Sequence, residues 1–231
     1  MTRTVFLPGL FGLDSDFKNL KRADDIVINL HDFQNSISDM KTLAKEVLAC
    51  LKKLPDQNFN ICGYSLGGRL AIFLKLLDTI YFKKCVIISS KVFFKYEECL
   101  PRLYWYIFWS LNFLFLSKKK FFSLWYSQSL FSGYSYNYFL PRKLELDFNF
   151  QRKCFMNLSN ILPMNPLKEL NKVKKDFLFI YGGFDEAYKN HYQHLLSLGF
   201  FVKEIPLASH VVMIDQPKKT KNITRSFLDY F

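Results

Sequence analysis

The feature that most constrains the fold is a serine between glycines, at the junction of a strand pattern and a helix pattern. Residues 58–62 form a short run typical of a buried strand, Gly63-Tyr64-Ser65-Leu66-Gly67 follows, and residues 69–77 have helical spacing. The glycines remove side chains that would clash in a sharp strand-to-helix turn, and such a turn holds the serine exposed in a strained conformation. We therefore predict that Ser65 is a nucleophile rather than a capping serine in an ordinary loop.

Strand and helix patterns alternate on both sides of this turn. We predict strands at residues 4–7, 26–30, 58–62, 85–89, 177–181 and 202–205, and helices at 38–54, 69–77, 188–198 and 223–230, with Ser38 capping the first helix. Such alternation predicts a mostly parallel sheet with helices on both faces. Between approximately residues 91 and 167 the alternation stops and the sequence becomes aromatic-rich and helical. We expect a single α/β domain over residues 1–231, with a helical cap insertion at 91–167.

Composition narrows the class of protein further. Half of the 231 residues are apolar, which excludes a disordered chain. The 32 Lys and Arg residues against 20 Asp and Glu give a net charge of +12. The lysines are spread along the chain, so we interpret the charge as a solvated surface and expect no nucleic-acid partner. Five widely spaced cysteines and no recognisable signal peptide predict reduced thiols and a cytoplasmic location.

A nucleophilic serine requires a base and an orienting carboxylate, in the chain order Ser, Asp or Glu, His. His210 lies in a loop after the last predicted strand, whereas His191 and His194 fit a surface helix face and His31 precedes the serine. Asp185 follows the strand at 177–181 and is the best acid, with Asp215 as a weaker rival. The backbone N–H groups of Leu66 and Leu10 are the expected oxyanion donors beside the predicted triad of Ser65, Asp185 and His210.

An uncharged aromatic run, residues 103–116, lies between Arg102 and the triplet Lys118, Lys119 and Lys120. Its fourteen residues fall short of the 18–20 or so needed to span a bilayer. We expect a buried or cap helix, with a weak membrane-surface contact as the alternative, because aromatic residues beside lysines suit an interface.

These residues resemble the α/β-hydrolase superfamily, across nearly the full chain. Three segments resemble its menaquinone and phylloquinone branch, which contains 2-succinyl-6-hydroxy-2,4-cyclohexadiene-1-carboxylate synthase. They are the turn with its following Gly68-Arg69, the segment Leu124-Trp125-Tyr126-Ser127-Gln128-Ser129-Leu130-Phe131, and the acid loop Tyr181-Gly182-Gly183-Phe184-Asp185-Glu186-Ala187-Tyr188.

The resemblance implies a lyase that eliminates pyruvate from a cyclohexene bearing several carboxylates. The triad serine would act as the base, and the oxyanion donors would stabilise enolate-like charge. The residues implied to bind the polycarboxylate substrate are Tyr64, Arg69, Arg102 and Trp125. The chain has no metal-ligand spacing and no phosphate-cradling loop, so we expect no metal and no cofactor.

Two other functions stay open. One is a serine esterase of the same fold, for example one acting on a pimeloyl ester of acyl carrier protein, an acidic partner that would suit the +12 charge. The other is a noncatalytic, membrane-associated interaction protein, for which the aromatic run at 103–116 is the main support.

Overall fold

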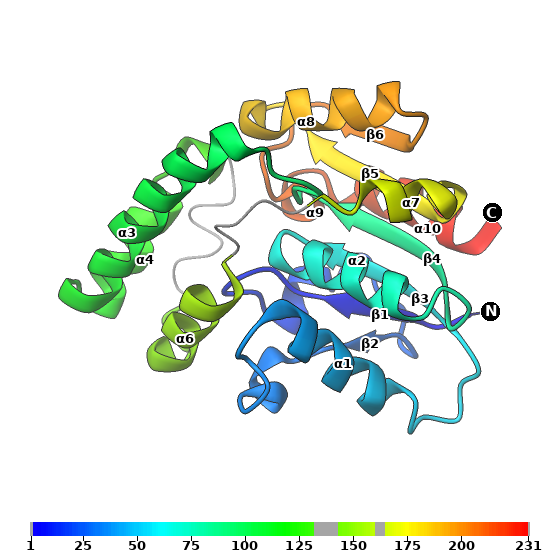
Figure 1. Ribbon diagram of the computed structural model, residues 1–231, viewed down its shortest axis with the longest axis horizontal. Helices are drawn as coiled ribbons and strands as arrows, with labels where there is room; N and C mark the ends of the chain where they lie inside the picture. Colours follow the sequence, from blue (N-terminus) through cyan, green and yellow to red (C-terminus); the bar gives the residue numbers. More distant parts are fainter. Residues whose placement is uncertain (1, 132–142, 160–164, 231) are drawn as a thin grey trace.

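A six-stranded, fully parallel sheet forms the centre of the computed structural model, which describes residues 2–131, 143–159 and 165–230. The strand order is β2-β1-β3-β4-β5-β6 (Figure 1). The strands are β1 Thr4–Leu7, β2 Ile26–Val27, β3 Phe59–Tyr64, β4 Phe82–Ile88, β5 Phe177–Gly182 and β6 Phe201–Ile205. The predicted α/β class and parallel sheet are therefore confirmed.

Helical segments connect most of the successive strands, because parallel neighbours need a crossover connection. The α-helices are α1 Met40–Leu51, α2 Leu66–Leu77, α3 Cys99–Phe115, α4 Lys118–Tyr126, α6 Phe148–Leu158, α7 Leu167–Lys172, α8 Glu186–Ser197, α9 Val212–Asp215 and α10 Pro217–Tyr230. Short 3-10 helices are η1 Asp14–Phe17, η2 Leu30–Phe33, η3 Tyr96–Glu98, η4 Ser129–Phe131 and η5 Lys174–Asp176.

Alternate residues of each strand face two separate cores, because side chains in a strand point to opposite faces. In β1, Val5 and Leu7 join the core under α1, α2 and α8, and Phe6 joins the core on the other face. That second core contains residues of α9 and α10 together with the aromatic side chains of α3 and α4. Both faces of the sheet are therefore covered, as predicted.

Several predicted boundaries are wrong: α10 begins at Pro217 and not at residue 223, and β4 begins at Phe82 and not at residue 85. Two further boundaries have an identifiable local cause. Asp39, and not Ser38, caps α1, because the Asp39 carboxylate accepts hydrogen bonds from the N–H groups of Lys41 and Thr42. The expected strand at 26–30 is only two residues long, and Leu30 begins a 3-10 helix in which the Asn29 side chain accepts from the N–H of His31. In both places a local side-chain-to-backbone hydrogen bond fixes the element boundary.

Between β4 and β5 the described residues form helices α3, α4, α6 and α7 and contain no strand. Helices α3 and α4 extend to one side of the sheet, beyond the carboxyl ends of the strands (Figure 1). The boundary predicted for the cap, 91–167, encloses these helices except for most of α7, and part of it lies outside the described residues.

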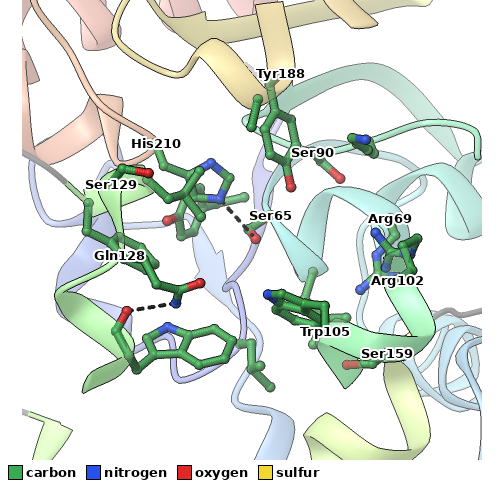
Figure 2. Close-up of a pocket in the computed structure, with 18 of the residues that line it drawn as sticks. Ser65, Arg69, Ser90, Arg102, Trp105, Gln128, Ser129, Ser159, Tyr188 and His210 are labelled. Atoms are coloured by element: carbon green, nitrogen blue, oxygen red, sulfur yellow. Dashed lines mark hydrogen bonds between the residues drawn. The ribbon is translucent and has the colours of Figure 1, made fainter. Parts of the chain in front are cut away.

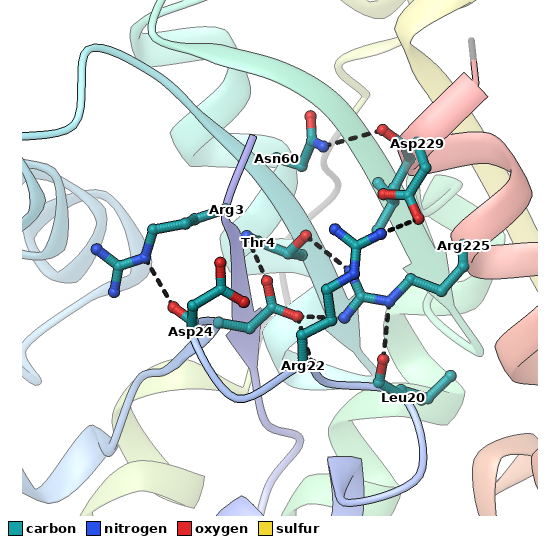
Figure 3. Close-up of polar contacts among 10 residues, drawn as sticks. Arg3, Thr4, Leu20, Arg22, Asp24, Asn60, Arg225 and Asp229 are labelled. Carbon is teal, nitrogen blue, oxygen red and sulfur yellow. Dashed lines mark hydrogen bonds and ion pairs between the residues drawn. The ribbon is translucent and has the colours of Figure 1, made fainter. Parts of the chain in front are cut away.

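Polar contacts tie the two ends of the chain together at the opposite, amino edge of the sheet (Figure 3). Arg225 of α10 pairs with the Asp25 carboxylate and donates to the carbonyl of Leu20 at 2.9 Å. The other oxygen of Asp25 accepts from the N–H of Thr4 in β1 at 2.8 Å. This network holds α10 against the edge of β1, far from the carboxyl ends where the site lies.

Candidate active site

The turn after β3 holds Ser65 in a backbone conformation that L-residues rarely adopt. Its φ of 52° and ψ of −113° lie outside the helical and extended regions. The flanking glycines make this turn possible. A Cβ on Gly63 would lie 2.3 Å from the carbonyl oxygen of Gly67, and one on Gly67 would lie 2.0 Å from that of Leu7. The turn is thus built against the end of β1.

Three carboxyl-edge loops bring Ser65, His210 and Asp185 together. His210 follows β6 and Asp185 follows β5, and parallel strands present these loops at one edge of the sheet. Nε2 of His210 lies 3.3 Å from Oγ of Ser65, and Nδ1 lies 2.7 Å from Oδ2 of Asp185 (Figure 2 shows the first contact). The Asp185 and His210 side chains are almost fully buried. This order of contacts allows a proton to pass between the serine hydroxyl and the imidazole while the carboxylate orients the ring.

Asp215, the weaker candidate for the triad carboxylate, contacts Ser209. Its carboxylate accepts hydrogen bonds from both the N–H and the hydroxyl of Ser209. It therefore fixes the loop that carries His210 from behind and does not contact the imidazole. The loop is also fixed from the cap side, because the N–H of His210 donates to the carbonyl of Leu130 at 3.2 Å.

The two remaining candidate histidines of α8 differ from each other. His194 is exposed, as predicted for a surface face. His191 is not: it is largely buried against the ring of Phe93, and its Nε2 accepts from the N–H of Val92 at 3.0 Å. Burial, together with the positive charge of Lys91, lowers the pKa of His191 to about 3, so this imidazole is neutral at physiological pH.

A cavity of about 690 Å³ opens in front of Ser65. It lies between the carboxyl edge of the sheet and the inner sides of α3 and α4. The sequence-predicted residues that line it are Leu10, Tyr64, Ser65, Leu66, Arg69, Arg102, Trp125 and His210. Asp185 lies behind His210 and does not line the cavity.

The two predicted oxyanion donors, Leu10 and Leu66, come from the segments that follow β1 and β3. Leu66 is the first residue of α2, so its N–H has no acceptor within the helix. Leu10 follows β1, and both residues line the cavity beside Ser65. The backbone at Gly9 approaches the turn closely: a Cβ there would lie 2.9 Å from ring atoms of Tyr64 and 3.2 Å from Cβ of Ser65.

Arg69 and Arg102 bring two positive charges to one wall of the cavity (Figure 2). Nη1 of Arg69 is buried and has no hydrogen-bond partner within the described residues. Burial, followed by the charge of Arg102, lowers the pKa of Arg69 to about 10, and burial likewise lowers the pKa of Arg102. The Arg102 guanidinium lies over the ring of Phe94, 3.9 Å from its centroid. Both side chains remain charged at neutral pH and are suited to carboxylate groups.

Two aromatic residues of the site, Trp125 and Tyr64, are also part of a hydrophobic core. Trp125 of α4 contacts Trp109 and Phe11 with ring centroids 4.6 and 5.0 Å away, and so belongs to the cap core as well as to the cavity wall. Tyr64 is buried next to His210, with ring centroids 5.5 Å apart. Burial raises the pKa of Tyr64 well above its usual value, so its hydroxyl keeps its proton.

Several cavity residues have no assigned role in the sequence prediction. Tyr188 lies one turn beyond Asp185 on α8, and its ring centroid is 5.0 Å from that of His210. The spacing of three residues was the signal that could have found it. Lys143 and Asp16 form a buried ion pair at 3.2 Å in the cavity wall, and their separation of 127 residues leaves no local signal in the sequence.

None of the described helices combines the length and the apolar character that a bilayer-spanning helix needs.

Comparison with known proteins agrees with this architecture. The α/β hydrolase fold family matches residues 4–217. A Haemophilus influenzae protein, assigned provisionally as a 2-succinyl-6-hydroxy-2,4-cyclohexadiene-1-carboxylate synthase, is 25% identical in an alignment of 179 positions that covers 70% of this chain and 69% of that protein.

Solved structures agree as well. MenH from S. aureus superposes with a TM-score of 0.84 at 17% identity, over 98% of this chain and 93% of that one. A carboxylesterase from Bacillus subtilis superposes with a TM-score of 0.66 at 16% identity, over 99% and 84%. At these identities the superpositions show the fold alone. The family match, which covers most of the chain, shows that this protein belongs to the α/β-hydrolase family.

Proposed function

We propose that this protein is a lyase of quinone biosynthesis. Its substrate would be 2-succinyl-5-enolpyruvyl-6-hydroxy-3-cyclohexene-1-carboxylate, and its products 2-succinyl-6-hydroxy-2,4-cyclohexadiene-1-carboxylate and pyruvate. The observation that carries the proposal is the pair of arginines, Arg69 and Arg102, in the same cavity as Ser65 and His210. The assignment of the Haemophilus influenzae relative supports the same reaction.

The reaction begins with removal of a ring proton by Ser65. Oγ of Ser65 takes the proton while its own proton passes to Nε2 of His210, 3.3 Å away. The Asp185 carboxylate, 2.7 Å from Nδ1, orients the ring and stabilises the imidazolium that forms. The electron pair of the broken C–H bond develops enolate-like charge, toward which the N–H groups of Leu10 and Leu66 donate.

The elimination is completed by cleavage of the C–O bond to the enolpyruvyl group. The electron pair becomes a ring double bond, and the leaving oxygen departs as enolpyruvate, which gains a proton at carbon to become pyruvate. The imidazolium of His210 returns its proton to the departing enolpyruvate, and Ser65 already holds the ring proton as its hydroxyl hydrogen, so both groups are back in their starting states. No acyl-enzyme forms, so the serine acts as a base and not as a nucleophile.

The substrate carries several carboxylates, and the cavity supplies matching cations. Arg69 Nη1 is buried without a partner among the described residues, so a substrate carboxylate would satisfy it. Arg102 would bind a second carboxylate from α3, and Tyr64 and Trp125 would pack on the ring. Together these contacts would hold the cyclohexene ring of the substrate over Ser65.

The experiment is an assay of pyruvate release, coupled to lactate dehydrogenase, for the wild type and for Ser65→Ala. Ser197→Ala is the matched control, since this exposed serine of α8 lies outside the cavity and donates only to the carbonyl of His194. We expect pyruvate release by the wild type and the control, and a loss of about 10³-fold or more in Ser65→Ala.

A serine esterase is the alternative, because the same three side chains can also support acyl transfer. The cationic cap would then suit an acidic acyl-carrier-protein partner. Cleavage of a short acyl ester by the wild type without pyruvate release from the lyase substrate would replace our proposal with this one. Absence of both activities would favour the noncatalytic reading of the fold.

A further inference from the structure

Helix α3 is apolar on both sides, and protein covers only one of them. The inner side contributes Trp109 and Phe113 to the cap core. The opposite side of α3 exposes apolar residues at a spacing of three or four. The exposed fraction of these side chains ranges from 38% at Leu103 to 80% at Phe115, the last residue of the helix. We call this set the α3 face, and it consists of Leu100, Leu103, Tyr104, Ile107, Phe108, Leu111, Leu114 and Phe115. A helix that is apolar all round is normally covered all round, so the α3 face is a binding surface.

The α3 face is long and lies at the margin of the molecule. The 17 residues of α3 give a helix of about 25 Å. Together with α4 it lies at the margin of the molecule, away from the sheet (Figure 1). This length is less than the ~30 Å hydrocarbon core of a bilayer, so α3 cannot cross one, but it can lie along its surface.

The α3 face has two acidic residues, Glu97 and Glu98, just before its amino end, and basic residues beyond its carboxyl end. Between Cys99 and Leu144 the sequence contains no Asp or Glu and six Lys or Arg residues. Three of these lysines, Lys118–Lys120, begin α4 directly after the face ends. A second copy of the chain would bring the same positive cap and a net charge of +12, so self-association is opposed. An anionic surface is attracted.

The α3 face offers almost no hydrogen bonding. Its only side-chain polar group is the hydroxyl of Tyr104, and the neighbouring Asn112 amide donates to the carbonyl of Phe108 within the helix at 2.8 Å. Protein interfaces of this size normally carry a hydrogen bond for every 100–200 Å² or so and a polar rim. The boundary of the acyl chains requires no such bonds, and tyrosine and tryptophan suit it.

We propose that α3 binds the surface of an anionic phospholipid bilayer. The α3 face would lie at the boundary between acyl chains and headgroups, and Lys118–Lys120 would contact the lipid phosphates. The inner side of α3 carries Arg102 and Trp105, which line the cavity, so the bound protein would hold its cavity next to the membrane. This inference concerns where the protein acts and does not depend on the proposed reaction.

The test is co-sedimentation of the full chain with vesicles of phosphatidylcholine alone or mixed equally with phosphatidylglycerol. One variant replaces Phe108, Leu111 and Phe115 by Gln, and its control replaces the exposed Ile80, Leu196 and Phe201 of the sheet domain by Gln. A second variant replaces Lys118, Lys119 and Lys120 by Gln, and its control replaces the exposed Lys218, Lys219 and Lys221 of α10 by Gln.

We expect the wild type and both controls to sediment with the anionic vesicles and not with neutral ones. Each α3 or α4 variant should bind about tenfold more weakly or worse, and added salt should weaken wild-type binding. Thermal unfolding of every variant checks that it is folded. Failure of the wild type to bind anionic vesicles, or equal binding by the variants and their controls, would overturn the proposal. A dimer that dissociates in the Phe108, Leu111, Phe115 variant, without vesicle binding, would instead assign the face to a second copy and would also overturn it.

Discussion

Replacement of Arg69 by Met separates substrate binding from protein stability. Met keeps much of the apolar stem of the side chain and removes the guanidinium. In the proposed complex the buried Nη1, which has no partner among the described residues, binds a substrate carboxylate. Loss of one partner from a desolvated, hydrogen-bonded charge pair costs about 2–5 kcal/mol. The expected loss in kcat/KM for pyruvate release is therefore about 30- to 5000-fold.

The same substitution should not lower the stability of the folded protein, in contrast to its effect on kcat/KM. Burial and the charge of Arg102 lower the pKa of Arg69 from 12.5 to about 10, which means that the folded protein disfavours the charged form. The shift corresponds to at most about 3 kcal/mol of unfavourable free energy in the folded state at neutral pH. Removal of the charge relieves this cost, and loss of packing offsets part of the gain. We expect the Tm of Arg69→Met to equal or exceed that of the wild type.

Three measurements distinguish this account from simple damage to the site. They are kcat/KM for pyruvate release, the rate on a neutral acyl ester, and Tm. Arg69→Lys should lose about tenfold, because lysine keeps the charge but not the planar fork. Arg152→Met, a cation on α6 outside the cavity, is the matched control. A loss below tenfold in Arg69→Met, an equal loss on the neutral ester, or a Tm lowered by more than about 5 °C would refute the reasoning.

Three further predictions follow from the packing. Asp185→Asn should lower kcat by about 10³-fold or more with little change in Tm, because the amide no longer fixes the tautomer of His210; a loss below tenfold would remove Asp185 from the mechanism. Gly67→Ala should lower Tm by about 6 °C or more, since its Cβ would meet a carbonyl oxygen at 2.0 Å, whereas the control Gly183→Ala meets only the end of a flexible carboxylate at 3.0 Å; equal effects of the two changes would contradict the packing argument. The wild type should lose about 2 kcal/mol of unfolding free energy between pH 7 and pH 5 through His191, because the unfolded chain binds a proton below about pH 6.5 while the folded imidazole stays neutral down to about pH 3; urea unfolding at both pH values should show this loss reduced in His191→Gln and unchanged if the reasoning is wrong.

Sequence patterns were sufficient for the sheet and for the carboxyl-edge residues, because both depend on local features. Apolar runs bounded by glycine predicted five of the six strands to within a few residues, and the position of Ser65, Asp185 and His210 after three of them followed from parallel pairing. The pattern failed where a single side chain decided the boundary. Asn29 and Asp39 each accept a backbone hydrogen bond that starts a helix, and neither bond has a periodic signal.

The environment of a side chain was harder to predict than its position. His191 fits a surface stripe in a helical pattern, yet the chain after β4 folds over it and gives it the N–H of Val92 as a donor. The buried pair of Asp16 and Lys143 joins residues 127 positions apart, and nothing in either neighbourhood indicates the other. Such contacts depend on how the cap lies over the sheet, which one sequence does not specify through local spacing.

Arg69 and Arg102 reach the same cavity from two parts of the fold. Arg69 comes from α2, directly after the turn that holds Ser65, and Arg102 comes from α3 of the cap. Burial lowers the pKa of both arginines, and the charge of Arg102 lowers the pKa of Arg69 further. A fold optimised only for stability would place an apolar side chain at position 69, because the buried Nη1 of Arg69 has no hydrogen-bond partner among the described residues. An anionic ligand bound by both guanidinium groups would offset this cost. The side chain that lowers the stability of the folded protein would therefore be the one that holds an anionic substrate beside Ser65.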